Sequence, residues 1–423
     1  MTSLFLQFHT LTGYPGALLN RDDAGFAKRL PFGGAVRTRI SSQCLKRHWR
    51  VYEGDWSLAS LGVPGSIRSR LTFEREILAP LLKEGVHEDV ARAVVDAVIV
   101  EVLGQSAKSK AKAKEEAEGA PAGDAARSGK VPDEEGDAKD GPRTGQITVL
   151  GRREVDWLLG EARAVCTSLS TSKDAGKAVK ARLGKQRAKN IDSLRKASAG
   201  LDAAMFGRMV TGDILSRGDA AVHVAHAFTV HEESSESDYF SAVDDLLREP
   251  DSDEAGSGHI GASELTSGLF YGYVVVDVPT LVANLEGVDP RRWMDADRSL
   301  AGRVVENLVH LISTVSPGAK LGSTAPYAYS SLVLAEAGTA QPRTLANAFV
   351  RPIDERPDVI ENACAALGDH IRRTDAAYEL RWTRRLAHTH PAGDRLAEQA
   401  AAGSAMSVPT LSAWAREMVV VGA

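Results

Sequence analysis

Alternating and helical patterns of apolar residues predict a mixture of strands and helices. Residues 4–11 alternate apolar with other side chains, which predicts a first strand that ends at the glycine- and proline-rich residues 13–16. Strand-like, β-branched and aromatic runs return at 220–230 and 269–278. Apolar residues at helical spacing predict helices at 71–82, 87–103, 152–169 and 304–315. The pattern alone therefore predicts an α+β protein.

The segment between the two later strands has a symmetry of its own. Residues 238–246 lead out to an acidic tip rich in glycine and serine at 249–258, and residues 259–265 lead back. Two such arms around a turn-forming tip predict a hairpin-like excursion between two central strands.

A helix that starts near Ser41 and Ser42, both common N-cap residue types, is predicted to have two different faces. At 100° per residue, one arc is basic and the other is mostly apolar. The basic arc consists of Gln43, Lys46, Arg47 and Arg50. The opposite arc consists of Leu45, His48, Trp49 and Tyr52. Cations beside the free N–H groups of a helix start are typical of a reader of phosphate backbones. An ordinary amphipathic helix with a solvated basic face is the alternative.

Composition restricts where such a reader can lie. The chain has 423 residues, of which 43% are hydrophobic and 25% charged, and its formal net charge is −5. A nucleic-acid surface must therefore be a local cationic stripe on an acidic body. The three cysteines are far apart, which argues against a disulfide scaffold or zinc ribbon and indicates a reducing compartment. No signal peptide or membrane-spanning run is recognisable, and a cytoplasmic location is expected.

Two charged stretches lie between the predicted helices. Residues 105–146 lack aromatic residues and are rich in Ala, Gly, Lys, Glu and Asp, which predicts a disordered insertion and favours a solvated linker over a nucleic-acid contact. Residues 175–201 are strongly basic. A solvated helix face and a DNA-facing surface are equally compatible with that run. The candidate DNA-facing residues are Lys177, Lys180, Lys185 and Lys189.

Several ordered blocks resemble the CasC family, the backbone subunit of the type I-E CRISPR Cascade complex. The most specific are Asn-Arg-Asp-Asp at 20–23, Phe-Gly-Gly at 32–34 and the Arg-Ile-Ser-Ser-Gln helix start at 39–43. Further blocks follow in family order at 207–209, 238–246, 266–273, 317–320, 346–349 and 409–414. Cys44 stands where the family often has Ser, and Ala35 where a Lys can occur, which puts one accessory cation in doubt.

This resemblance implies a modified RNA-recognition-motif (ferredoxin-like) palm, with an inserted helical fingers domain and a protruding thumb hairpin. The implied division is palm at 1–57, fingers at 58–204, palm at 205–231, thumb at 232–267, and palm with the C-terminal region at 268–423. The residues implied to bind RNA are Asn20, Arg21, Lys28, Ser41, Ser42, Gln43, Lys46, Arg47, Arg50, Arg208, Met209, Ser241 and Lys320. Met209 and Ser241 match positions that flank a splayed guide nucleotide.

The implied role is a subunit that polymerises along a CRISPR guide RNA, kinks it at regular intervals and presents it to target DNA. Its implied partners are the guide RNA, target DNA, further copies of itself in a filament and the other Cascade subunits, with no membrane. We expect no enzyme activity, cofactor or metal. A general single-strand RNA-binding protein is an alternative.

A metal-dependent ribonuclease that uses Asp22 or Asp23 is the rival from a different class. The Asn-Arg-Asp-Asp run is equally typical of a turn in which Asx side chains bond their own backbone, and we favour that interpretation. His9 has no partner identifiable from sequence, so packing is favoured over catalysis. The pairs His223/His226 and His388/His390 lack the spacing or further ligands of a metal site.

Overall fold

The computed structural model describes residues 3–103, 142, 144, 147–169, 171–193, 200–208, 218–243, 257–319 and 321–422. Most of the predicted insertion at 105–146 and of the hairpin tip at 249–258 lies outside these residues. The chain divides into two compact units. Unit 1 comprises residues 1–57, 223–278 and 301–423, and unit 2 comprises 58–222 and 279–300. Residues 205–222 and 279–300 thus cluster with unit 2, which differs from the division implied by the resemblance.

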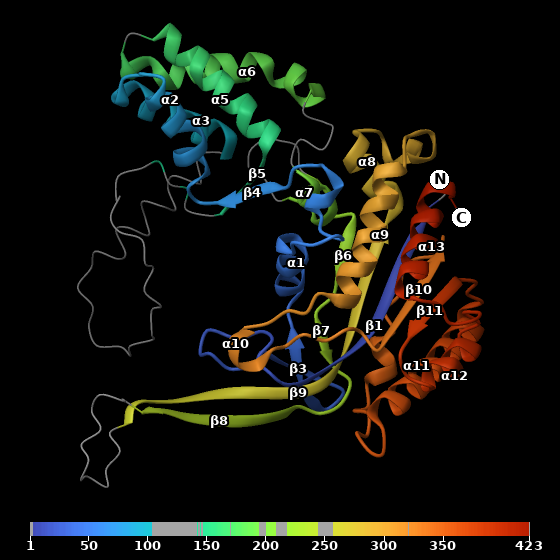
Figure 1. Ribbon diagram of the computed structural model, residues 1–423. Helices are drawn as coiled ribbons and strands as arrows, with labels where there is room; N and C mark the ends of the chain where they lie inside the picture. The colour runs from blue at the N-terminus through green and yellow to red at the C-terminus, as the bar shows by residue number, and fades with distance from the viewer. Residues whose placement is uncertain are drawn as a thin grey trace, which may run out of the picture. The chain divides into compact units, whose positions relative to one another are not determined.

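Figure 1 shows the elements in chain order. The strands are β1 (Phe5–Ala17), β2 (Arg29–Phe32), β3 (Ala35–Ile40), β4 (Ser66–Ser69), β5 (Thr148–Gly151), β6 (Val222–Val224), β7 (Ala227–Thr229), β8 (Ser234–Val243), β9 (Ser257–Asp277), β10 (Leu332–Gly338) and β11 (Thr383–His388). The helices are α1 (Ser42–Val51), α2 (Ala79–Lys83), α3 (Glu88–Leu103), α5 (Arg152–Ser168), α6 (Ala175–Ser193), α7 (Leu201–Phe206), α8 (Val278–Glu286), α9 (Ser299–Thr314), α10 (Leu321–Thr324), α11 (Val359–Tyr378), α12 (Ala392–Gln399) and α13 (Val408–Val421). None of the described helices is long and apolar enough to cross a membrane.

Within the described residues, nine strands form one sheet in unit 1, in the order β11-β10-β1-β9-β7-β3-β2, with β6 and β8 also paired to β9. The pairings of β1 with β10 and β9, and of β7 with β9, are antiparallel. Along the chain, α1 lies between β1 and β7, and α9 lies between β9 and β10. The four central strands therefore follow a β-α-β-β-α-β order within the larger antiparallel sheet.

The first strand is longer than the sequence predicts. Residues 13–16 do not end β1, which runs to Ala17 with an irregularity in its pairing to β9 between Tyr14 and Ala17. Gly16 has a φ of +51° there, and its N–H donates to the Ser267 hydroxyl at 2.8 Å. Long-range pairing with β9 therefore overrides the local preference of glycine and proline to break a strand.

Both faces of this sheet are covered. Leu11 and Tyr271 belong to an apolar cluster with Leu367 of α11 and Leu396 of α12. Tyr14, three positions after Leu11, and Phe270, which precedes Tyr271, belong to a different cluster. That cluster includes Ile40, and Cys44 and Leu45 of α1 pack against it. Because side chains at odd and even positions of a strand point to opposite faces, α1 and the pair α11/α12 lie on opposite sides of the sheet.

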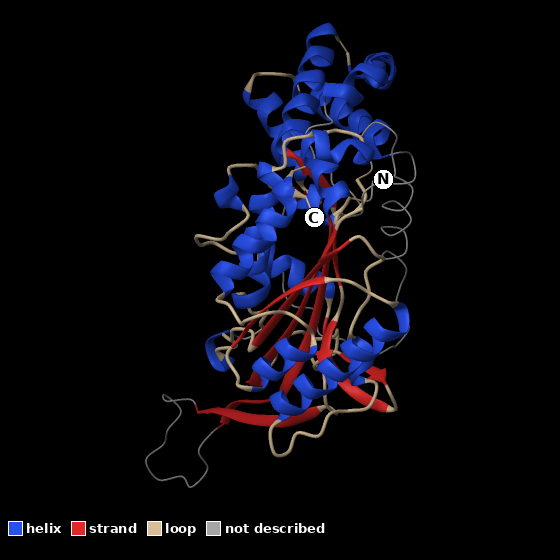
Figure 2. Ribbon diagram, turned by 90° about the vertical axis from the view of Figure 1, so that its right-hand side faces the viewer, coloured by secondary structure: helices blue, strands red, loops and turns tan. Residues whose placement is uncertain are grey.

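The predicted excursion is a two-stranded hairpin. β8 pairs with the first half of β9 in antiparallel register, from Ser234 opposite Ser267 to Val243 opposite Ser257. The second half of β9 pairs with β1 in the central sheet. Both views show the hairpin extending away from the rest of unit 1 (Figures 1 and 2). One long strand thus anchors the projecting arm in the sheet.

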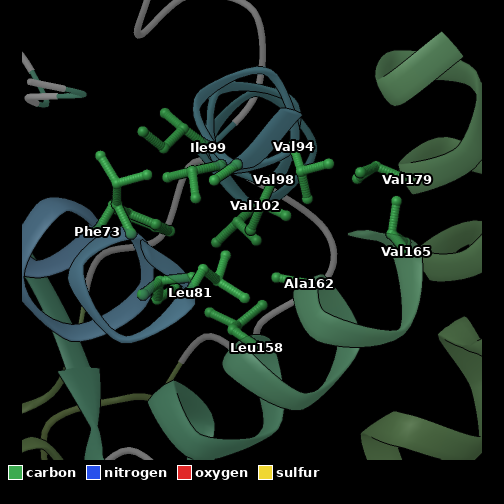
Figure 3. Close-up of a cluster of buried hydrophobic side chains, with 14 of the residues drawn as sticks. Phe73, Leu81, Val94, Val98, Ile99, Val102, Leu158, Ala162, Val165 and Val179 are labelled. Atoms are coloured by element: carbon green, nitrogen blue, oxygen red, sulfur yellow. The ribbon is translucent and has the colours of Figure 1, made fainter. Parts of the chain in front are cut away.

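Unit 2 has a helical core of its own. Apolar side chains from α3, α5 and α6, such as Val98, Leu158 and Val179, meet Phe73 and Leu81 in one buried cluster (Figure 3). The helices predicted at 87–103 and 152–169 are confirmed as α3 and α5, and that predicted at 71–82 contains a π-helical segment at Glu74–Leu78. A two-stranded sheet of β4 and β5 lies within the same unit, as far as the described residues show.

Candidate nucleic-acid interface

Helix α1 has the two faces that the sequence predicts. Ser41 is its N-cap, with φ −70° and ψ 147°, and its hydroxyl accepts the Cys44 N–H at 3.3 Å. Trp49 is buried, whereas Arg47 is exposed and Lys46 is half-buried. The hydroxyl of Ser41 is therefore committed to the cap, and the basic arc is the part of the helix that can meet a ligand.

The Asn20–Asp23 segment is a turn that holds the start of α1. The Asn20 side-chain oxygen accepts the Ser41 N–H at 2.9 Å, and the Asn20 carbonyl accepts the Lys28 N–H at 2.9 Å. One carboxylate oxygen of Asp22 accepts the N–H groups of Ala24 and Phe26, each at 3.0 Å. This is the Asx-type turn that the sequence favoured for this run.

The Phe-Gly-Gly block forms the tight connection between β2 and β3. Phe32 pairs with Ala35, and Gly33 and Gly34 have φ values of +64° and +83°. Positive φ at both positions matches a type I′ hairpin turn, which favours glycine. A Cβ on Gly33 would also lie 1.5 Å from the Val350 carbonyl oxygen, so this position has no room for a side chain.

Arg29 of β2 fastens this hairpin to the base of the projecting arm. Its guanidinium contacts Glu233 at 2.5 Å and also pairs with Glu264 of β9. The other carboxylate oxygen of Glu264 accepts the Ala27 N–H at 2.7 Å. Both carboxylates are thus engaged by the 20–32 region, which fixes this loop at the foot of the β8–β9 hairpin.

Several cations lie beside α1, and they influence the pKa of two neighbouring side chains, His226 and Cys44. The pKa of His226 is lowered by partial burial and by the positive charges of Arg39, Lys28 and Lys46. Burial raises the pKa of the Cys44 thiol, while Lys28 and Arg47 act in the opposite direction. We call Lys28, Arg39, Lys46 and Arg47 the cationic cluster. Positive charges gathered on one part of a surface attract an anionic ligand such as a phosphate backbone.

Arg39 and His226 are members of this region that the sequence did not single out. An Arg39 Nη1–H lies 2.9 Å from His226 Nδ1, and its Nε–H donates to the Arg29 carbonyl at 3.0 Å. Arg37, two positions earlier, is buried and donates to the carbonyl oxygens of Thr229 and Phe349. Strand alternation does not separate them, because side chains two positions apart in β3 belong to the same face of the strand. Their partners distinguish them, since Arg37 donates to buried carbonyl groups and Arg39 contacts His226, which directly precedes β7.

The loop that leads to Lys320 is held beside α1. His48 Nδ1 donates to the Cys44 carbonyl at 2.8 Å, which leaves Nε2 to accept the Gly318 N–H at 3.4 Å. The Ala319 N–H donates to the Leu18 carbonyl at 2.9 Å. Lys320 itself lies outside the described residues.

The remaining implied RNA contacts and the candidate DNA-facing lysines have the following positions. Arg21 and Gln43 are exposed, Arg50 is half-buried, and Ser42 is buried at the first turn of α1. Met209 lies outside the described residues, and Ser241 belongs to β8 without a described side chain. On α6, Lys177 and Lys180 are exposed, whereas the side chains of Lys185 and Lys189 are not among those described.

Arg208 requires a correction. Its guanidinium is buried in unit 2 and forms a two-point ion pair with Glu154, with Nη2 2.9 Å from Oε1. The same group also donates to the Val149 carbonyl at 3.3 Å. A side chain committed in this way supports the fold, and the structure removes it from the candidate RNA-binding set.

His9 has the partner that the sequence could not reveal. Its Nε2 lies 3.1 Å from Glu336 and its Nδ1 lies 2.8 Å from the Tyr271 hydroxyl. Arg343 and Arg384 donate to the same Glu336 carboxylate at 2.7 Å and 2.6 Å. Arg384 also pairs with Asp375 of α11 at 2.6 Å. We call His9, Glu336, Arg343, Asp375 and Arg384 the buried ion network.

The pKa values of this network fit one arrangement of protons. Burial lowers the pKa of His9, so its imidazole is neutral, donates from Nε2 to Glu336 and accepts from Tyr271. Burial alone would raise the pKa of Glu336, but the hydrogen bond from His9 and the charge of Arg343 hold it well below the usual value. The network therefore joins the sheet to α11 and leaves His9 no free proton site for catalysis.

Among the described residues, no group of three or more His, Cys, Asp or Glu side chains is arranged to hold a metal ion. His390 instead lies 3.0 Å from Asp358, and His388 lies 3.2 Å from Asp394.

Comparison with known protein families shows which family this chain belongs to. The model of the CT1975-like proteins, a family of Cas proteins, matches residues 6–414. The chain belongs to this CT1975-like Cas family. None of the curated proteins matches it.

Two solved structures share the fold. A chain of a "CRISPR RNA-guided surveillance complex, pre-nicking" matches with a TM-score of 0.69 and 24% identity, over 97% of this chain and 100% of that chain. A chain of a second "CRISPR RNA-guided surveillance complex" matches with a TM-score of 0.54 and 21% identity, over 99% of this chain and 100% of that one. At these identities the likeness concerns the fold.

Proposed function

We propose that this chain is a guide-RNA-binding backbone subunit of a CRISPR surveillance complex of the Cascade kind. The observation that carries the proposal is the cationic cluster on and beside α1, displayed by a fold that recurs in CRISPR RNA-guided complexes. Cations on a fixed frame bind the phosphates of any sequence, which suits a subunit that must hold many different guides. Sequence recognition then belongs to base pairing between guide and target.

The strand order supports a modified RNA-recognition-motif palm. The central order β10-β1-β9-β7, with α1 and α9 as connections, is that of a ferredoxin-like β-α-β-β-α-β unit. Recognition motifs of this type usually stack bases on the open sheet face. Here α11 and α12 cover one face and α1 packs on the other, so we assign the RNA to the cationic cluster at the edge of the palm.

The projecting arm and unit 2 receive the other implied roles. We assign the β8–β9 hairpin as the thumb that kinks the guide at regular intervals, with Met209, Ser241 and Lys320 as further contacts. Unit 2 corresponds to the fingers, and the exposed Lys177 and Lys180 on α6 are its candidates for target DNA. Head-to-tail contacts between copies would build the filament, because a heterologous interface need not close into a ring. We place the complex in the cytoplasm, as type I-E, and assign the chain no enzyme activity.

A charge-reversal experiment tests the proposal. The variant Lys46→Glu/Arg47→Glu reverses two charges of the cationic cluster, and Arg373→Glu/Arg381→Glu reverses two exposed charges on and after α11. Each chain is co-expressed with its neighbouring subunits and a CRISPR array, and the bound RNA is quantified and sequenced. We expect the first variant to emerge with little RNA and the second to carry as much as the unmodified chain, at equal thermal stability.

Two results would contradict the proposal. A well-folded Lys46→Glu/Arg47→Glu variant with an unchanged amount of RNA would remove α1 from the interface. Bound RNA of mixed sequence, without CRISPR-repeat segments, would instead support the general single-strand binder.

A further inference from the structure

Two tyrosines project from an extended segment between α10 and β10. Tyr327 and Tyr329 are each 75% exposed, whereas Pro326 and Ser330 are buried and Ala328 is half-buried. This strict alternation places both rings on the outer side of the segment. Single exposed aromatic residues are common on protein surfaces, but two neighbouring rings on one side form a surface suited to a flat partner.

The backbone beneath these rings is held in place. The Ser316 hydroxyl donates to the Ala328 carbonyl at 2.9 Å, and the Ala328 N–H donates to Ser316 Oγ at 2.9 Å. The Ser330 hydroxyl lies 2.8 Å from Thr12 Oγ1, and the Ser330 N–H donates to the Ser313 carbonyl at 2.8 Å. Both rings therefore project from a fixed base, which lowers the entropy cost of binding a ligand between or upon them.

The tyrosines lie on the same side of the sheet as α1, which carries Lys46 and Arg47 of the cationic cluster. Ala328, which separates them, packs on the apolar cluster of Tyr14 and Ile40 that Cys44 and Leu45 of α1 also contact. The connection that precedes α10 is hydrogen-bonded to α1 through Gly318 and His48. Aromatic faces next to backbone-binding cations are the two components of a single-strand nucleic-acid site.

We propose that Tyr327 and Tyr329 stack on nucleobases of the single-stranded RNA whose phosphates meet the cationic cluster. This inference rests on the proposed function and adds base contacts to it. Two residues of extended chain span about 6.6 Å, close to twice the ~3.4 Å repeat of stacked bases, so the two rings are spaced to receive one base between them. Stacking on a tyrosine face tolerates every base, and the site therefore holds any guide sequence.

The test compares two RNAs that carry the same backbone charge. A short single-stranded RNA and an abasic ribose-phosphate strand of equal length are titrated against the full chain, and affinity is measured at several salt concentrations. In the unmodified chain the base-containing strand binds more tightly. Tyr327→Ala/Tyr329→Ala weakens that strand by roughly five- to 150-fold per stacked base, leaves the abasic strand unaffected and keeps the same salt dependence.

Two further variants make the test specific. Tyr327→Phe/Tyr329→Phe keeps both rings and retains the affinity. Tyr378→Ala removes a tyrosine that is 74% exposed at the end of α11, and changes neither titration.

Failure of this inference and failure of the proposed function give different results. If Tyr327→Ala/Tyr329→Ala binds both strands as the unmodified chain does, the stacking proposal is overturned while the RNA-binding proposal stands. The same holds if this variant only abolishes association between copies of the chain, since the rings would then form a protein contact. If the unmodified chain binds neither strand, both proposals fall together.

Discussion

The buried ion network joins the sheet to α11, whereas the cationic cluster lies on and beside α1, which packs on the opposite face of the sheet, and the two groups use arginine differently. In the network, Arg343 and Arg384 meet the carboxylates of Glu336 and Asp375, and the side chain of Glu336 is fully buried. In the cationic cluster, Arg39, Lys28 and Lys46 face a histidine whose pKa they lower. Matched charges hold α11 against the sheet, whereas the cationic cluster brings like charges close to one another.

This difference shows that charge in a sequence motif does not define a binding site until its partners are known. Arg208 lies in a motif implied to bind RNA, yet Glu154 neutralises it inside unit 2. Arg39 lies in a strand and was not singled out, yet it joins the cationic cluster. The comparison predicts two separate outcomes of mutation. Changes in the network should lower stability, and changes in the cluster should weaken RNA binding.

The largest effect is expected from Glu336→Gln. The substitution keeps the shape of the side chain but leaves Arg343 and Arg384 short of a buried negative charge. We expect the free energy of unfolding to fall by about 3–5 kcal/mol, measured by urea denaturation. Glu361→Gln, which removes a partly exposed pair with Arg395, is the control and should cost about 0–1 kcal/mol. Equal losses in the two variants would show that the network does not hold the fold.

The second prediction concerns pH and His9. The pKa of His9 is lowered in the folded chain, so below about pH 6.5 the unfolded chain binds a proton that the folded chain does not. Stability should therefore fall as the pH decreases from 6.5, with a contribution from His9 of up to about 1.4 kcal/mol per pH unit.

His9→Gln isolates this contribution. Glutamine can still donate to Glu336 and accept from Tyr271, but it does not titrate. Urea denaturation between pH 7 and 5 should give a shallower loss of stability for the variant. An identical pH dependence would show that His9 does not remain neutral in the folded chain.

Sequence reasoning predicted local features well because their causes are local. The two faces of α1, the cap at Ser41 and the Asx-type turn at Asp22 each follow from residues a few positions apart. The β8–β9 hairpin joins two segments that are consecutive in the chain, and its pairs lie 14 to 33 positions apart. The buried network could not be predicted, because Glu336 comes to His9 through the pairing of β1 with β10, 327 residues apart. The covering of the sheet by α11 and α12 is likewise a long-range event.

The cap of α1 provides the third prediction. Ser41→Ala removes the acceptor of the Cys44 N–H, and we expect a loss of about 1 kcal/mol in the free energy of unfolding. Ser41→Asn keeps a capping oxygen and should retain most of that stability. The RNA affinity of the folded Ser41→Ala chain should change less than that of Lys46→Glu/Arg47→Glu. A larger change would mean that the hydroxyl itself meets the RNA.

The fourth prediction concerns Arg47 and the dependence of RNA affinity on salt concentration. Arg47→Ala should reduce the slope of log affinity against log salt by about 0.7 for single-stranded RNA, which corresponds to one phosphate contact. Its stability should change by no more than about 0.5 kcal/mol, because Arg47 is exposed. Arg381→Ala is the matched exposed arginine and should leave both quantities unchanged. An unchanged slope for Arg47→Ala would place the RNA elsewhere on the surface.

The smallest effect, and the one that separates a binder from a nuclease, is expected at Asp22 and Asp23. Asp22→Ala removes the acceptor of the Ala24 and Phe26 N–H groups and should loosen the turn that positions Asn20 and Lys28, with a modest loss of RNA affinity. Asp23→Ala removes an exposed side chain and should change neither stability nor affinity.

A ribonuclease would reverse this order of effects, because its metal-dependent cleavage would depend on a carboxylate that can reach the RNA. Incubation of the complex with RNA and magnesium distinguishes the two. Regularly spaced fragments that disappear in Asp23→Ala would contradict the binder, and intact RNA with a weaker Asp22→Ala complex would confirm that the turn serves to place the cations.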